Sequence, residues 1–154
     1  MSTDEISAPG AGTADWSRPE SAAEARDTVR RLLSEGLSGE ASGTGRATGT
    51  TGPAGPIEET RLADALLVTS ELVTNAIRHG GGVTWFAARV TREGLRLQVT
   101  DRSRVRPVAA ARTDDAFGAQ PGGHGWRLIQ RLCRDITVTP LAGGKTIQVL
   151  VGLI

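Results

Sequence analysis

The stretch "TSELVTNAIRHGGG", residues 69–82, decides the fold, because it ends an apolar helix and sets two polar side chains into it. Glu71 and Asn75 are four residues apart, so a helix places them one turn apart on the same face. Glu71 is the only charged residue between Asp64 and Arg78. We therefore expect the pair to face an enclosed space rather than bulk water.

The helix that carries this pair is predicted from about residue 57 to His79, and the glycines at 80–82 end it. At roughly 100° per residue, Glu71 and Asn75 project beside Leu67 and Val68. The opposite face is apolar and consists of Leu62, Ala65, Leu66, Thr69, Val73 and Ala76. Both sides of the helix are thus predicted to be covered.

The length and charge of the chain limit the classes of protein to consider. Its 154 residues suit one domain with a real core, and 18 basic against 17 acidic residues give no reason to bind nucleic acid or an anionic membrane. The single cysteine, Cys133, cannot form an internal disulfide. No signal peptide and no run of about 18 apolar residues is found. We therefore expect a soluble cytoplasmic protein.

The composition divides the chain into a tail and one interrupted domain. Small polar residues predict a disordered tail over residues 1–16, followed by a single domain over 17–154 that opens with an amphipathic helix over 19–37. Residues 38–56 are mostly Gly, Ser, Thr, Ala and Pro, which cannot bury enough apolar surface to order the segment. We expect a flexible insert there.

The second half of the chain predicts two hairpins and one more helix. Strands are expected over 83–90 and 95–101, a helix over 122–133, and strands over 135–141 and 145–154. The order helix, helix, hairpin, helix, hairpin predicts the α+β class, with an antiparallel or mixed sheet and helices on one face.

Asp101 is the polar residue of interest on these strands, because it shares its face with Leu95, Leu97 and Val99 and so points into the core. A carboxylate at that place either caps the following loop or accepts a hydrogen bond from an amino group such as that of adenine. The connection over 102–122 is longer than usual, which favours a lid or a mobile binding loop.

Spacing alone leaves two interpretations of the other polar groups. An amide oxygen suits Mg²⁺ and a carboxylate in a half-apolar setting can act as a general base, but Glu71 could equally pair with an arginine and Asn75 with the backbone. Gly122, Gly123 and Gly125 precede a helix, so their N–H groups can hold phosphate or form a plain turn. No GxxxxGK[ST] segment is present, which excludes a P-loop.

Four segments together resemble a known family. In order and spacing, "ELVTNAIRHG", "VTDRS", "GGHGWRLI" and "GGKTIQV" are similar to the N, G1, G2 and G3 boxes of the GHKL or Bergerat-fold ATP-binding superfamily. The resemblance covers residues 19–38 and 57–154 and is strongest to anti-sigma regulatory factors, serine/threonine kinases of actinobacterial type. It implies a two-layer α/β sandwich whose mixed, mostly antiparallel sheet carries its helices on one face.

The resemblance also implies roles for single residues. Glu71 would be the base that activates a substrate hydroxyl, and Asn75 would coordinate the Mg²⁺ that bridges the phosphates of ATP. Asp101 would recognise adenine, with Thr146 near the base directly or through a water. The remaining residues implied to lie at the phosphates are Gly122, Gly123, Gly125 and, unless it only bonds backbone, His79.

Two departures from the family pattern are visible. The G1 box usually reads DxGxG, and Ser103 and Val105 occupy its glycine positions here; the insert over 38–56 is the other departure. Four arginines of the predicted lid either touch phosphate or a partner, or are solvated charges: Arg102, Arg104, Arg106 and Arg112.

The leading functional hypothesis is an Mg-ATP-dependent kinase that binds a sigma factor and phosphorylates a STAS-type anti-sigma-factor antagonist. The alternative is a nucleotide-dependent protein-binding module without phosphoryl transfer. A sensor histidine kinase is disfavoured, because no dimerisation helix with a phosphoacceptor histidine precedes the boxes and both His79 and His124 lie inside them. Relatives often dimerise, so a homodimer stays open.

Overall fold

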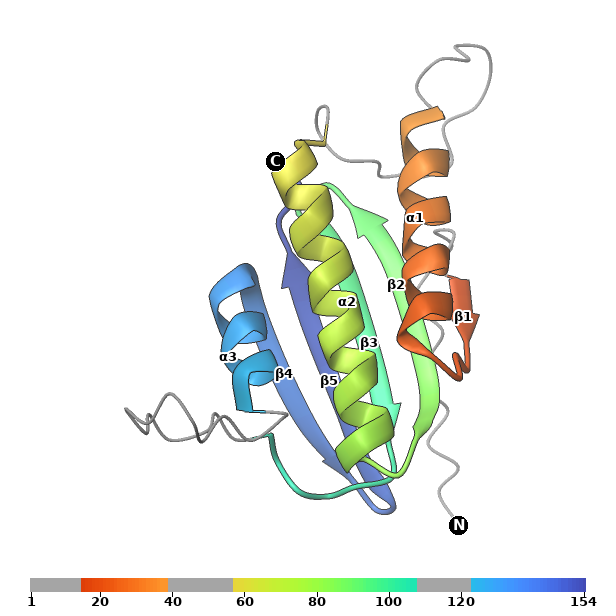
Figure 1. Ribbon diagram of the computed structural model, residues 1–154, viewed down its shortest axis with the longest axis vertical. Helices are drawn as coiled ribbons and strands as arrows, with labels where there is room; N and C mark the ends of the chain where they lie inside the picture. The colour runs from red at the N-terminus through yellow and green to blue at the C-terminus, as the bar shows by residue number, and fades with distance from the viewer. Residues whose placement is uncertain (1–14, 39–56, 108–122) are drawn as a thin grey trace.

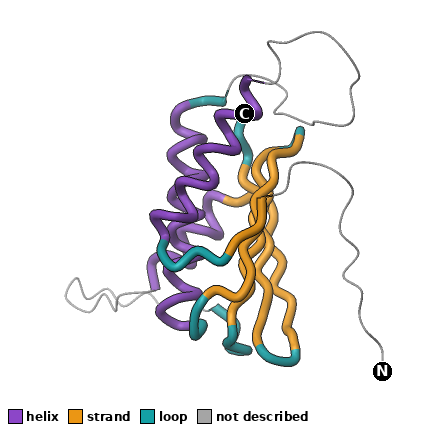
Figure 2. Tube along the Cα trace, turned by 90° about the vertical axis from the view of Figure 1, so that its right-hand side faces the viewer, coloured by secondary structure: helices purple, strands orange, loops and turns teal. Residues whose placement is uncertain are grey.

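The computed structural model describes residues 15–38, 57–107 and 123–154 (Figure 1). These ranges form two layers, with all described helices on one face of the sheet (Figure 2). The helices are α1 (Ala22–Ser38), α2 (Glu59–His79) and α3 (Gly123–Leu132). The strands are β1 (Asp15–Ser17), β2 (Val83–Thr91), β3 (Gly94–Asp101), β4 (Cys133–Leu141) and β5 (Gly144–Val151). The predicted α+β class and the sandwich are therefore confirmed.

The sheet has the strand order β1-β2-β3-β5-β4, and every neighbouring pair of the described strands is antiparallel. Both predicted hairpins form, as β2 with β3 and β4 with β5. β5 pairs with β3, so the last residue of β3, Asp101, lies opposite Lys145 near the start of β5. The mixed pairing that the resemblance implied is not seen among the described strands.

The short strand β1 corrects the predicted N-terminal tail, since Asp15 and Trp16 pair with Ala88 and Ala87 of β2. Three residues are too few to show a period of two in the sequence. An edge strand of this length depends on its partner rather than on its own pattern. Most of the predicted insert, residues 39–56, and residues 108–122 of the predicted lid lie outside the described residues.

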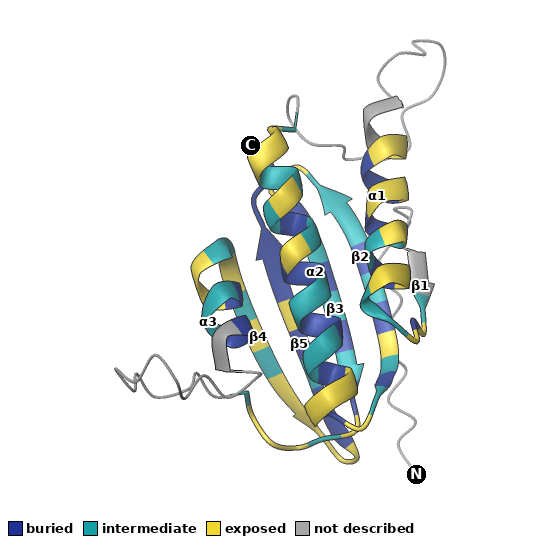
Figure 3. Cartoon of the chain, in the orientation of Figure 1, coloured by how far each residue is buried: buried dark blue, intermediate teal, exposed yellow. Residues whose placement is uncertain are grey.

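The core lies between the helices and the face of the sheet that they cover (Figure 3). The buried side chains of α2 are Ala65, Val68, Thr69, Leu72, Val73 and Ala76. They pack on Phe86 of β2 and on Leu97 and Val99 of β3, all nearly inaccessible to solvent. α1 lies beside α2 towards β2, while α3 packs against α2 on the β4 side (Figure 1).

The end of α2 brings it close to the end of β3. The N–H groups of Gly80 and Gly82 both bond the carbonyl of Ala76, at 3.0 and 2.9 Å. Gly81 and Gly82 have φ of 71° and 105°, which side chains other than glycine rarely adopt, so the chain reverses sharply there. The Arg102 N–H then bonds the Gly80 carbonyl at 2.7 Å and ties the exit of β3 to α2.

Candidate functional site

Glu71, Asn75 and Gly125 lie together where the start of α3 meets the middle of α2. A Cβ placed on Gly125 would overlap the Glu71 carboxylate and lie 3.7 Å from the Asn75 Oδ1 atom. Glycine is therefore what allows α3 to approach these two side chains. Both are half-buried, and neither makes a hydrogen bond or ion pair within the described ranges. An arginine partner for Glu71, the structural alternative, is thus not found there.

The first turn of α3 adds backbone donors to this cluster. The helix begins at Gly123, and its first N–H groups have no partner within the helix. These groups and the helix dipole attract anions such as phosphate. Because Gly125 is in this turn, the donors lie beside Glu71 and Asn75. Gly122 falls outside the described residues.

His79 is the last residue of α2, one further turn along from Asn75. Its side chain is exposed and forms no hydrogen bond with any part of the chain that the structure describes. The structure therefore leaves it beside the cluster without a structural partner there, and its role at phosphate stays a prediction.

Asp101 forms a second polar group at the end of β3, and its predicted inward orientation is confirmed by an exposed fraction of 5%. Its carboxylate accepts hydrogen bonds from the Lys145 ammonium at 3.1 and 2.8 Å and from the Ser103 N–H at 2.9 Å. A Cβ on Gly80 would lie 2.5 Å from the Asp101 Cγ atom, so α2 also approaches it closely. These donors satisfy the buried carboxylate, which would otherwise be costly to keep charged.

Lys145 is a site residue that the sequence interpretation missed. It lies directly opposite Asp101 in the β3–β5 register, is 6% exposed, and also donates to the Ser103 carbonyl at 3.2 Å. Residues opposite one another in an antiparallel pair share one face of the sheet. The alternation of Lys145 with Ile147 and Val149 could have indicated this inward position.

The structure does not bring Thr146 to the Asp101 side chain, and its place near adenine stays a prediction. Its hydroxyl lies 2.8 Å from that of Thr100. Thr100 and Thr146 neighbour Asp101 and Lys145 along their strands, and successive side chains of a strand point to opposite faces. Thr146 is therefore on the face of the sheet away from the helices.

The described arginines of the predicted lid, Arg102, Arg104 and Arg106, are all exposed. Their guanidinium groups make no ion pair within the ranges that the structure describes. Arg112 lies outside those ranges. Their contacts with phosphate or a partner remain predictions.

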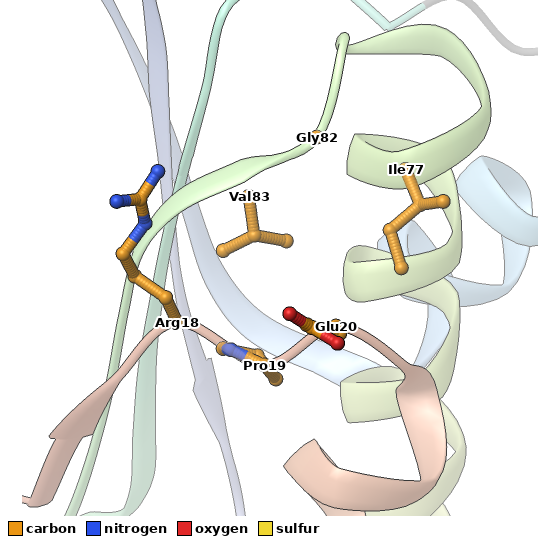
Figure 4. A pocket seen from close by; sticks show the side chains of 6 residues that line it. All are labelled: Arg18, Pro19, Glu20, Ile77, Gly82 and Val83. Atoms are coloured by element: carbon orange, nitrogen blue, oxygen red, sulfur yellow. The ribbon is translucent and has the colours of Figure 1, made fainter.

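A hollow of about 560 Å³ lies elsewhere, between the start of β2 and the segment that enters α1 (Figure 4). Its lining is Arg18, Pro19, Glu20, Ile77, Gly82 and Val83. Ile77 follows Asn75 by two residues, which turns it about 200° around the helix. None of the predicted site residues lines this hollow, so it is separate from the polar groups described above.

The polar groups fit a nucleotide with its metal. Within the described ranges no cluster of three His, Cys, Asp or Glu side chains could hold a metal ion. Mg²⁺ in nucleotide sites takes only one or two protein ligands besides phosphate and water, and the Asn75 amide oxygen can be one. The α3 N-terminus suits phosphate and the Asp101 carboxylate suits an amine.

A comparison with protein families shows the family of this chain. The model of the histidine kinase-like ATPase domain family matches residues 16–150, so the chain belongs to this family of GHKL-type, ATP-binding domains. No curated protein matches the chain by sequence. No helix of the described ranges is long and apolar enough to cross a membrane.

A solved structure from Mycobacterium tuberculosis shows the same fold. The RsbU and RsbW domains of Rv1364c from Mycobacterium tuberculosis are 20% identical, with a TM-score of 0.51 over 92% of this chain and 32% of that one. The blue-light activated histidine kinase of Erythrobacter litoralis EL346 is 19% identical, with a TM-score of 0.47 over 84% of this chain and 42% of that one. This chain thus spans about a third to two fifths of those proteins.

Proposed function

We propose that this protein is an Mg-ATP-dependent serine/threonine protein kinase of the anti-sigma type. It phosphorylates a STAS-type antagonist in the cytoplasm and controls a sigma factor. The observation that carries the proposal is the contact of Gly125 with Glu71 and Asn75, which joins a carboxylate, an amide and a helix N-terminus.

Glu71 is the general base of the proposed reaction. A half-buried carboxylate without an ion-pair partner among the described residues is free to accept a proton. It takes the proton of the serine or threonine hydroxyl of the antagonist while that oxygen bonds to the γ-phosphorus of ATP and ADP leaves. Bound ATP supplies the phosphoryl group and Mg²⁺ neutralises its charge.

The other residues bind and orient. Asn75 would hold Mg²⁺ through its Oδ1 atom, and the N–H groups at the start of α3 would hold phosphate. Asp101 would accept a hydrogen bond from the amino group of adenine. Positioning of this kind, rather than covalent chemistry, supplies most of the catalysis in phosphoryl transfer.

The regulatory part of the proposal rests on analogy of fold. The RsbW domain named in the Mycobacterium tuberculosis structure supports the anti-sigma branch, and the net charge of +1 supports protein rather than nucleic-acid partners. Phosphorylation of the antagonist would release this protein to bind its sigma factor.

Two observations favour a second function, a nucleotide-dependent binding module without phosphoryl transfer. Asp101 is already bonded to Lys145, and Ser103 and Val105 replace the glycines of the G1 box. Both features lie where the adenine of ATP would bind, and neither involves Glu71 or Asn75.

Incubation with γ-labelled ATP, Mg²⁺ and each STAS-domain protein of the host separates the two functions. The kinase predicts label on a serine or threonine of one such protein, and loss of that label with Glu71→Gln. Glu59→Gln is the matched control, because Glu59 is an exposed acid at the other end of α2. ATP binding without transfer to any of these proteins would support the module instead.

A further inference from the structure

Asp101 and Lys145 are the buried charged residues of the described ranges, and they pair with each other. Their closest atoms, Lys145 Nζ and Asp101 Oδ2, are 2.8 Å apart. A buried charge is costly unless it is paired and hydrogen-bonded. The ion pair therefore satisfies the one carboxylate that the proposed function assigns to adenine.

The backbone holds the carboxylate in place around this pair. A Cβ on Gly144 would overlap the Asp101 carbonyl, and a Cβ on Gly80 would collide with its carboxylate. The close approach on both sides leaves Asp101 little freedom to move. Lys145 differs, because its ammonium lies at the end of a flexible four-carbon stem.

The hydrogen bonds of Lys145 are fully used in this arrangement. An ammonium group has three donors, and those of Lys145 reach Asp101 Oδ1, Asp101 Oδ2 and the Ser103 carbonyl. No donor is left for the acceptor atoms of a base. An amine that approaches Asp101 thus meets a carboxylate whose charge is already neutralised at close range.

We propose that Lys145 is a specificity-determining residue that competes with the adenine amino group for Asp101. The inference rests on the proposed function, which places adenine at this carboxylate. When the base binds, its amine replaces the Lys145 ammonium on the Asp101 Oδ2 atom. The new hydrogen bond is exchanged for an existing one, so the amine adds little to the affinity.

The residue type fits this role. Lys145 is the only lysine of the chain, among 18 basic residues. An arginine at this position would hold the carboxylate with a rigid planar fork, whereas the compact ammonium of a lysine can leave it and be hydrated. Its departure also frees the Ser103 carbonyl, at the start of the segment that follows β3.

The first test compares ATP with purine riboside triphosphate, which carries hydrogen in place of the amine. We expect wild type to prefer ATP by less than about threefold. A hydrogen bond to a carboxylate that no other donor shares raises binding affinity by about tenfold or more. The Lys145→Met protein should therefore bind ATP about tenfold more tightly than wild type. Its affinity for the amine-free nucleotide should stay nearly the same. Lys145→Gln, which keeps a polar group, should show the same direction.

Gln148→Val is the matched control, because it changes an exposed residue of β5 on the other face of the sheet. Equal or weaker ATP binding by the Lys145 variants would overturn the inference. A wild-type protein that does not bind ATP would overturn the proposed function and the inference together. If wild type binds ATP and the ratio of its affinities for ATP and the amine-free nucleotide is the same in the Lys145 variants, this inference alone is overturned.

The second test needs no variant, since ¹⁵N-lysine labels a single side chain in this protein. We expect the Nζ resonance of Lys145 to shift when saturating ATP is added, and to shift much less with purine riboside triphosphate. A resonance that saturating ATP leaves in place would overturn the competition.

Discussion

Gly125 lies so close to Glu71 that a methyl group on the glycine would overlap the carboxylate. The start of α3 therefore fixes where Glu71 can be, although the two residues are far apart in the sequence. The overlapping atoms belong to the end of a flexible side chain, so a larger residue at position 125 would move Glu71 rather than α3.

Gly125→Ala tests this relationship. We expect the displaced carboxylate to slow phosphoryl transfer by about 10²-fold, as small misplacements of catalytic groups do, with little change in melting temperature. Gly143→Ala is the control, since a Cβ there meets nothing within 4 Å. Wild-type transfer rates for Gly125→Ala would contradict the assigned contact.

Asn75→Ala tests the metal ligand. If Asn75 holds Mg²⁺, the substitution weakens ATP binding much more in magnesium than in EDTA, because only the metal-bridged contact is lost. Calorimetric titration in the two buffers measures the difference. Equal losses in both would remove Asn75 from the metal site.

Asp101→Asn tests the base end of the site. The amide presents a donor in place of an acceptor, so ATP affinity should fall and the preference for ATP over GTP should shrink. The variant also leaves the Lys145 ammonium without its counter-charge, which costs about 3–5 kcal/mol of stability for a buried pair. Gln148→Val should leave the ATP to GTP ratio unchanged, because Gln148 is exposed on the face of the sheet away from Asp101. The same ratio in all three proteins would place adenine elsewhere.

Cys133 gives a prediction about pH. Burial raises the pKa of its thiol from 9.0 to about 12. The thiol is then protonated in the folded protein at pH values where the unfolded chain has already lost the proton. The free energy of unfolding that the protonated Cys133 thiol contributes is fully present below about pH 9. It is lost as the pH rises towards 12. Chemical denaturation at pH values from 8 to 11 should show that the free energy of unfolding falls more steeply with pH for wild type than for Cys133→Ala. The same dependence on pH in both proteins would refute the shifted pKa.

Local patterns in the sequence predict much of the fold and the orientations of Glu71, Asn75 and Asp101. The spacing of Glu71 and Asn75 and the period of two that ends at Asp101 each concern one element, and both orientations are observed. Helical and strand periods report the face on which a residue lies without knowledge of its partners.

The rest depends on how strands pair. Lys145 and Thr146 are adjacent, so a shift of one residue decides which of them meets Asp101. The register selects Lys145, which the resemblance did not indicate. β1 likewise exists through its pairing with β2, which no pattern within Asp15–Ser17 could reveal.

The central claim is that Glu71 is the catalytic base of a kinase, and the Glu71→Gln variant tests it most directly. Gln preserves the volume of the half-buried side chain, so ATP affinity and melting temperature should stay near those of wild type. Single-turnover transfer from labelled ATP to the antagonist should slow by roughly 10²–10⁴-fold. Transfer at the wild-type rate by a normally folded, ATP-binding Glu71→Gln protein would contradict the claim.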